Sequence, residues 1–253
     1  MRNRIYCSVA CFFLGFTTLA SYPGSARTSP ELARFDEECA QARRVIRQYC
    51  AVVQEMMKDP KMDENKQLKG ISLVQKAKEQ WTKVMSAWGD TPPAEYASDA
   101  AFKARLQDFA HAIEDMENAL AAGNPRRSFM ACSFGCGLFV TMHEQNGLAY
   151  ALDALFHLRK SVKTAEAVMK AQGIDNVRPL LPEILQKRDR VLVAPAPWRR
   201  GDDRLLPYYD SVRQLSRQMD EFTLAVETND LPAARAALKE LLSQINQAYG
   251  LSL

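Results

Sequence analysis

FKARLQDFAHAIEDMENALAAGNP, residues 102–125, is the stretch that decides the fold class of this 253-residue chain. Its apolar residues recur at steps of three and four, the spacing that places them on one face of an α-helix. Gly123 is typical of a helix end, and Asn124 followed by Pro125 is typical of an N-cap with proline at the first helical position. The stretch therefore predicts a helix that ends in a tight turn and is followed at once by a second helix.

The same spacing continues along the rest of the chain, and no segment alternates with a period of two for long. Because a half-buried strand needs that period of two, the pattern predicts helices alone. They are expected at about 32–59, 74–88, 102–122, 125–146, 149–172, 176–193, 205–228 and 231–249. The fold class is accordingly predicted to be all-α.

The two halves of the chain resemble each other at an offset of 106 residues. The matching stretches are 106–120 with 212–226, the turn Gly123-Asn124 with Asn229-Asp230, and the proline loops near 92 and 195. We therefore predict two tandem up-down four-helix bundles, formed by residues 27–147 and 148–253. A single helical array without a true repeat is the alternative, since amphipathic helices resemble one another by pattern.

Residues 1–26 are typical of a secretory signal peptide. Arg2 and Arg4 precede an apolar stretch that runs from Ile5 to Ala20, and small residues lead up to Ala26. We therefore expect the mature chain to be periplasmic or secreted, without membrane insertion after cleavage. Loss of the two arginines lowers the formal net charge from +3 to +1. This balance gives no electrostatic footprint for nucleic acid.

One predicted helix carries an unusual stripe of side chains. The stripe consists of Cys132, Cys136, Phe139 and His143, and at the 106-residue offset it is matched by Leu238, Leu242, Ile245 and Tyr249. Steps of four, three and four place all of these side chains on one helix face. The first half therefore has two thiols and an imidazole where the second half has an ordinary core stripe.

The four cysteines of the mature chain allow two uses. An even number of cysteines in an oxidising compartment favours disulfides. If the first and fourth helices run antiparallel, Cys39 lies level with Cys136 and Cys50 level with Cys132, so we expect Cys39–Cys136 and Cys50–Cys132 disulfides. The alternative is a soft metal ion such as copper, held by Cys132 and Cys136 with Cys39. One ion cannot take both Cys136 and His143, because two helical turns, about 10.5 Å, separate them.

The last helix of each half resembles that of the cytochrome c-prime family, exported four-helix bundles with haem attached near the C-terminus. In that family the final helix follows a short turn and ends in Cys-x-x-Cys-His. The corresponding slot holds Phe139-Val140-Thr141-Met142-His143 in the first half and Ile245-Asn246-Gln247-Ala248-Tyr249 in the second. Because both thioether cysteines are absent, the resemblance implies non-covalent haem in the first half. His143 would be its axial ligand, beside Met142 and Phe139.

Other polar and small residues are interpreted more simply. Arg43-Arg44 is typical of a solvated helix face, and His157 has no partner at ligand spacing, so it is expected at the surface or its boundary. Gly135 and Gly137 lie inside a predicted helix, where each costs about 1 kcal/mol relative to alanine. The two glycines therefore indicate close approach of another helix or of a flat cofactor.

The sequence contains no Ser/His/Asp order, glycine-rich phosphate loop or carboxylate-histidine helix motif, so an enzymatic role is not favoured. We expect a bundle that binds haem non-covalently or a soft metal ion in its first half, for electron transfer, ligand binding or metal handling. The alternative is a cofactor-free, disulfide-stapled bundle that recognises another envelope protein through a helical face.

Overall fold

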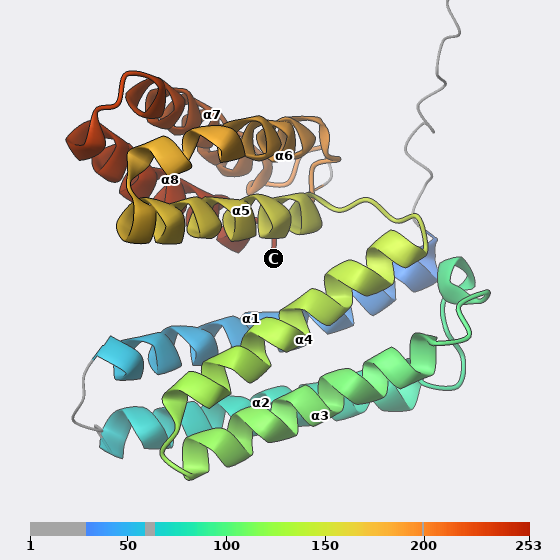
Figure 1. The fold of residues 1–253 in the computed structure, drawn as a ribbon. Coiled ribbons are helices and arrows are strands. Elements are labelled where there is room, and N and C mark those ends of the chain that lie inside the picture. Colours follow the sequence, from blue (N-terminus) through green and yellow to red (C-terminus); the bar gives the residue numbers. More distant parts are fainter. Residues whose placement is uncertain (1–28, 59–63, 199) are drawn as a thin grey trace, which may run out of the picture.

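A computed structural model describes residues 29–58, 64–198 and 200–253, which are almost entirely helical (Figure 1). Its α-helices are α1 (Pro30–Lys58), α2 (Glu64–Trp88), α3 (Phe102–Ala121), α4 (Pro125–Gln145), α5 (Ala151–Gln172), α6 (Leu181–Val193), α7 (Leu205–Glu227) and α8 (Leu231–Leu251). Short 3-10 turns lie in the loops: η1 (Ala94–Tyr96), η2 (Ile174–Asn176) and η3 (Arg178–Leu180). The described ranges contain no strand, so the predicted all-α fold class is confirmed.

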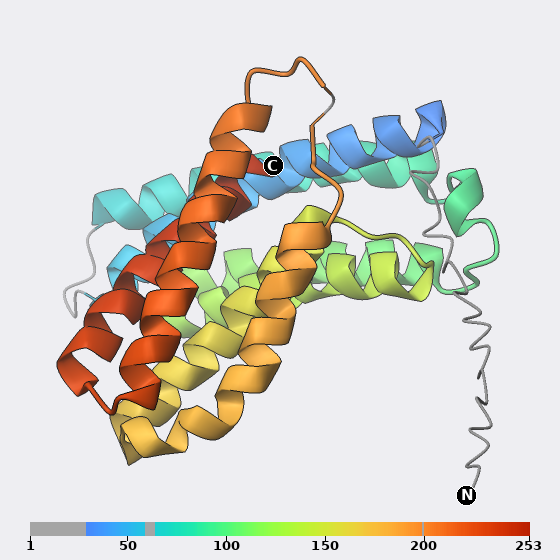
Figure 2. The ribbon, with the colours of Figure 1, turned by 90° about the horizontal axis from the view of Figure 1, so that it is seen from above.

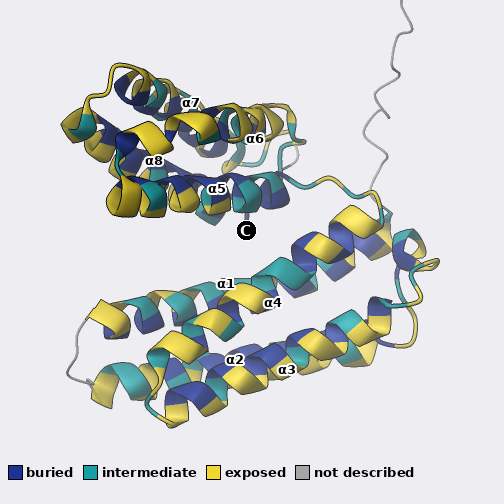
Figure 3. Ribbon diagram, viewed as in Figure 1, coloured by how far each residue is buried: buried dark blue, intermediate teal, exposed yellow. Residues whose placement is uncertain are grey.

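Helices α1 to α4 share one cluster of buried apolar side chains. α1 packs on α2 and α4, and α3 packs on the same two helices. Trp81 of α2 is 2% exposed, and its Nε1–H donates to the carbonyl of Leu106 at 3.0 Å. Its ring lies against Phe109 and Phe139, which brings α2, α3 and α4 together. Figure 3 shows buried residues along the faces that these helices turn toward one another.

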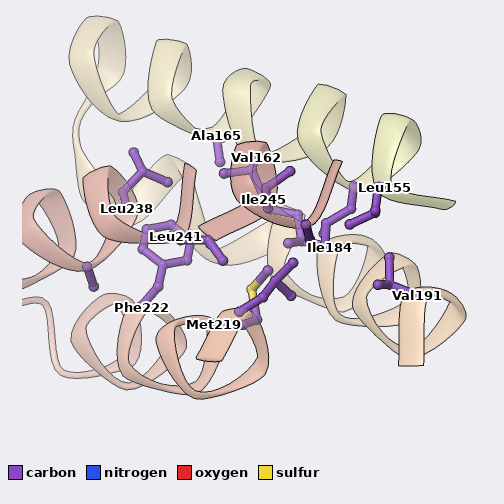
Figure 4. Close-up of a cluster of buried hydrophobic side chains, with 14 of the residues drawn as sticks. Leu155, Val162, Ala165, Ile184, Val191, Met219, Phe222, Leu238, Leu241 and Ile245 are labelled. Carbon is purple, nitrogen blue, oxygen red and sulfur yellow. The ribbon is translucent and has the colours of Figure 1, made fainter. Parts of the chain in front are cut away.

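Helices α5 to α8 share a second, separate cluster. Here α7 packs on α8, α5 packs on α6 and α8, and α6 packs on α7. Figure 4 shows side chains from all four helices meeting at the centre of this cluster, among them Leu155, Val162, Ile184, Met219, Phe222, Leu241 and Ile245. Seen from above in Figure 2, α7 and α8 run across the direction of α1.

The turns before α4 and α8 share their geometry at the 106-residue offset. The side chains of Asn124 and Asp230 each accept a hydrogen bond at 3.0 Å from the backbone N–H three residues later. The preceding residues, Gly123 and Asn229, both have positive φ angles, 70° and 58°. The helical hairpins α3–α4 and α7–α8 are therefore alike in the details of their turns as well as in their apolar pattern.

The stripe expected on α4 faces inward along most of its length. Cys132, Phe139 and His143 are each less than 5% exposed, whereas Cys136 is partly exposed. The matching positions of α8 follow the same order, with Leu242 as the partly exposed member. Positions of α4 and α8 that are 106 residues apart therefore match in their burial as well as in their apolar spacing.

A disulfide between Cys50 and Cys132 links α1 to α4, with the two Cα atoms 6.7 Å apart, so this predicted pairing is confirmed. The second predicted pairing is wrong, because Cys39 and Cys136 are free thiols. Cys39 belongs to the buried cluster of α1 to α4, whereas Cys136 lies outside that cluster. The two thiols therefore occupy different environments although their helices are neighbours.

Some predicted helix ends differ from the structure. α6 begins at Leu181 rather than near residue 176, since Pro179 and Pro182 fit the short turn and the first turn of a helix better than a helix interior. α2 begins at Glu64 rather than near residue 74. The earlier start was not predicted because the first turns of this helix carry little of the apolar stripe. The predicted signal peptide and the first helix's predicted end near Asp59-Pro60 lie outside the described residues.

We expect the double variant Cys50→Ala/Cys132→Ala to lose about 2–5 kcal/mol of unfolding free energy, because the disulfide spans 82 residues and restricts the unfolded chain. Urea unfolding followed by circular dichroism measures the loss. Reductant should destabilise the natural chain by a similar amount and leave the double variant unchanged. A natural chain whose unfolding midpoint is the same with and without reductant would contradict this role of the disulfide.

Candidate functional site

A cavity of about 930 Å³ lies between the two groups of helices. One wall comes from α1 and α4, and the other comes from α5 and α8, with Leu253 at the edge. Figure 1 shows α5 lying over α1 and α4, where these walls meet. The volume is within the range of cavities that hold a small organic ligand.

Aromatic rings form the apolar part of the cavity. Phe129, Phe134 and Phe139 come from α4, and Phe156 comes from α5. Phe139 is also part of the buried cluster of α1 to α4, so its ring separates that core from the cavity. Phe134 is 59% exposed, which leaves an aromatic surface at the opening. The cavity therefore offers an apolar molecule several rings to pack against.

The two glycines of α4 differ in their surroundings. A Cβ added at Gly135 would lie 3.1 Å from the Phe109 ring, so α3 and α4 approach closely there and the ring would have to shift to admit a side chain. A Cβ added at Gly137 would have only Phe156 within reach, at 4.0 Å, because Gly137 faces the cavity. Gly135 fits the close helix approach expected from the sequence, and Gly137 keeps one wall of the cavity free of a side chain.

The cavity is also basic. Five cationic side chains line it: Arg43 and Arg47 from α1, and Arg159, Lys160 and Lys163 from α5. The one carboxylate side chain in the described lining is Glu144, whose Oε1 lies 2.8 Å from Nε2 of His157. Positive charge therefore exceeds negative charge among the side chains around this space.

Arg43 lies against an aromatic ring rather than on a solvated helix face, which corrects the interpretation from sequence. Its guanidinium carbon is 4.6 Å from the centroid of the Phe139 ring. His157, expected at the surface or its boundary, is partly exposed, pairs with Glu144 and lines the cavity. The interpretation of Arg43 fails because the facing helices α4 and α5 create the cavity, and periodicity within one helix does not reveal which distant helix covers it.

Cys136 is the free thiol of this cavity. Burial raises the pKa of its thiol, while the positive charges of Arg43 and Arg159 act in the opposite direction. The neutral thiol therefore predominates at neutral pH. In this state the residue contributes a small, polarisable surface to the cavity rather than a thiolate.

The structure does not bring together the three cysteines expected to hold a metal ion. Cys132 is bonded to Cys50, and a disulfide sulfur is not the thiolate ligand that a soft metal needs. Cys39 is buried in the core of α1 to α4, and Cys136 faces the cavity. Within the described residues, no group of three or more His, Cys, Asp or Glu side chains is arranged to hold a metal ion.

His143 is part of a buried polar network where the two groups of helices join. Its Nδ1 lies 2.7 Å from Oδ2 of Asp153 on α5, and its ring stacks on Tyr150 with centroids 4.2 Å apart. The Tyr150 hydroxyl donates to Oδ2 of Asp36 on α1 at 2.8 Å. Residues His143 and Asp153 are only 4% and 5% exposed. The sequence singled out His143 and missed Asp153, its partner across the next turn.

The surroundings of His143 leave no space for haem beside its ring. A hydrogen bond from Nδ1 to Asp153 is itself compatible with ligation through the other ring nitrogen. However, His143 is 4% exposed, its ring lies against Tyr150, and it does not line the cavity. Of its expected companions, Met142 is 2% exposed within the core, and Phe139 alone reaches the cavity.

Comparison of the chain with known protein families, curated proteins and solved structures finds no match. Among the helices described, none is long and apolar enough to cross a membrane. The functional argument therefore depends on the cavity and on the network beside it.

The carboxyl group of Asp36 gives this network a pH dependence. Burial raises the pKa of Asp36 above its usual value, although the Tyr150 hydrogen bond and the charges of His143 and Arg43 oppose the shift. The folded chain therefore holds this proton to a higher pH than the unfolded chain does. Stability from this group is complete below the unfolded pKa, near 4, and declines as the pH rises through the folded pKa.

We compare the unfolding free energy of Asp36→Asn with that of the natural chain. We expect the variant to gain stability relative to the natural chain at pH 7 compared with pH 4, because asparagine can accept the Tyr150 hydrogen bond without a buried charge. Urea unfolding at several pH values between 4 and 7 measures this difference. Glu37→Gln, at an exposed neighbouring carboxylate, is the matched control. A difference that is independent of pH, or equal for the two variants, would show that Asp36 is not the group responsible.

Proposed function

We propose that this chain is a ligand-binding protein that holds a small, largely apolar molecule in the cavity between α1 and α4 on one side and α5 and α8 on the other. The observation that carries the proposal is the cavity itself. It has a volume of about 930 Å³, aromatic rings along one wall and a glycine where a side chain would fill it. Such a space is the usual setting for small-molecule binding.

We also propose that the fold is a tandem pair of four-helix bundles, residues 27–147 and 148–253, that arose from one repeated unit. Two separate apolar clusters and the matched caps of α4 and α8 support this arrangement. In this view the ligand lies between the repeats rather than inside the first one. Export to the periplasm or the exterior, proposed from residues 1–26, is compatible with the disulfide.

The cavity favours an organic ligand over the two cofactors expected from sequence. Copper would need thiolates that the disulfide and the burial of Cys39 keep apart. Haem on His143 would need space beside a ring that is 4% exposed and does not line the cavity. The second candidate function is recognition of an envelope protein, which is supported by Met130 and Phe134 of α4, 65% and 59% exposed and one helical turn apart.

The variant Gly137→Leu tests the proposed function because it places a side chain inside the cavity. We expect the natural chain to bind the neutral, polarity-sensitive dye Nile red at one site, and the variant to bind it at least about tenfold more weakly. Helix stability should not fall, since leucine is a better helix former than glycine by about 1 kcal/mol. Dye fluorescence measures binding, and thermal unfolding measures stability.

Ala87→Leu is the matched control, because it adds the same side chain to an exposed position of α2, which does not line the cavity. This control should bind Nile red as the natural chain does. A natural chain that does not bind the dye, or a folded Gly137→Leu chain that binds it normally, would refute the cavity as a ligand site. Normal binding by both leucine variants would favour the exposed Met130 and Phe134 surface instead.

A further inference from the structure

Two guanidinium nitrogens beside the cavity have no partner. Nη2 of Arg43 and Nε of Arg159 are inaccessible to solvent, and neither makes a hydrogen bond to any residue in the described ranges. A buried donor left without an acceptor costs about 1–3 kcal/mol, and more when it is charged. The two arginines come from different groups of helices and both line the cavity, although these two nitrogens are themselves covered by protein atoms.

The side chains of the cavity supply few acceptors to these arginines. Tyr249 hydrogen-bonds Arg43, and the Glu144 carboxylate is paired with His157. Burial lowers the pKa of Arg43, but Tyr249, Cys136 and Asp153 raise it above its usual value overall. Among the described residues, none of the five cationic side chains of the cavity forms a salt bridge there, and Arg47 instead donates to the carbonyl of Asn246 at 2.8 Å. The five cationic side chains are therefore paired with no carboxylate of the described cavity lining.

The positive charges on the two walls also act on each other. Burial lowers the pKa of Arg47, and the nearby positive charge of Arg159 lowers it further. Within the α5 wall, burial lowers the pKa of Lys163, and the positive charge of Arg159 lowers it further. Like charges that face each other across a partly buried space destabilise it unless an anion lies between them.

We propose that the ligand is an amphipathic acid of about the size of a single acyl chain. Its carboxylate or phosphate oxygens accept hydrogen bonds from Arg43 and Arg159, and its chain packs along Phe129 and Phe156. This inference rests on the proposed function and names the class of ligand for the same cavity. Guanidinium groups suit it because they bind carboxylate and phosphate oxygens through directed N–H groups.

The test compares three twelve-carbon probes that share one chain and differ in the head group. Dodecanoate, dodecyl phosphate and dodecanol are each used to displace Nile red from the natural chain. We expect the better of the two anions to bind at least about tenfold more tightly than dodecanol, since hydrogen bonds to charged groups exceed those to neutral ones. The order of the two anions identifies the head group that the arginines prefer.

Two substitutions then locate the head group. We expect Arg43→Gln and Arg159→Gln each to weaken binding of the preferred anion about tenfold and to leave dodecanol binding nearly unchanged. Arg190→Gln removes the same charge at an exposed position of α6 away from the cavity. This variant should bind both the preferred anion and dodecanol as the natural chain does. Added salt provides a measurement on the natural chain alone, because it should weaken binding of the anion more than that of dodecanol.

The outcomes separate the two proposals. If Nile red binds and dodecanol displaces it as well as both anions do, the acid head group is refuted while the ligand site stands. If the natural chain binds no dye, the proposed function itself is refuted. Equal loss of anion affinity in Arg190→Gln and in Arg159→Gln would show a general charge effect and would overturn the assignment of the head group to these arginines.

Discussion

The buried hydrogen-bonded pair of His143 and Asp153 fixes how the second group of helices lies on the first. His143 is near the end of α4 and Asp153 is in the first turn of α5, and neither can leave the pair without exposing a buried polar group to an apolar environment. Tyr150 extends the network to Asp36 and thereby to α1. The start of α5 is thus held against both helices that form the opposite wall of the cavity.

The position of α5 determines which of its side chains face the cavity. Arg159 follows Asp153 by six residues, about 9 Å along the helix axis, so the His143–Asp153 pair and the basic part of the cavity share one continuous helix. On the opposite wall, Arg43 is held over the Phe139 ring. The buried network and the cavity are therefore parts of one junction between the two groups of helices.

The junction stays open for physical reasons that can be read from its side chains. Gly137 contributes no side chain to the gap, and Phe156 leaves space opposite to it. Arg47 on α1 and Arg159 on α5 place like charges on opposite walls of this gap. Buried guanidinium nitrogens without a partner are a local cost of the kind that proteins retain at functional sites.

Much of the fold could be predicted from the sequence because it is encoded locally. The apolar spacing of α3, the Asn124 cap and the level of Cys50 with Cys132 each depend on residues within one helix or on two adjacent helices. The site could not be predicted in this way. Arg43 and Arg159 are 116 residues apart, and each looks like part of a solvated face until the two helices are placed opposite one another.

In the two matched hairpins, the residues that line the cavity are only partly the ones that the sequence singled out. The stripe positions pair His143 with Tyr249, and only Tyr249 lines the cavity, whereas His143 faces Asp153. Cys136 and its partly exposed counterpart Leu242 differ in the same way, since only the thiol reaches the cavity. Corresponding residues therefore have different surroundings in the two groups of helices. This difference lies in the facing surfaces and leaves both apolar clusters intact.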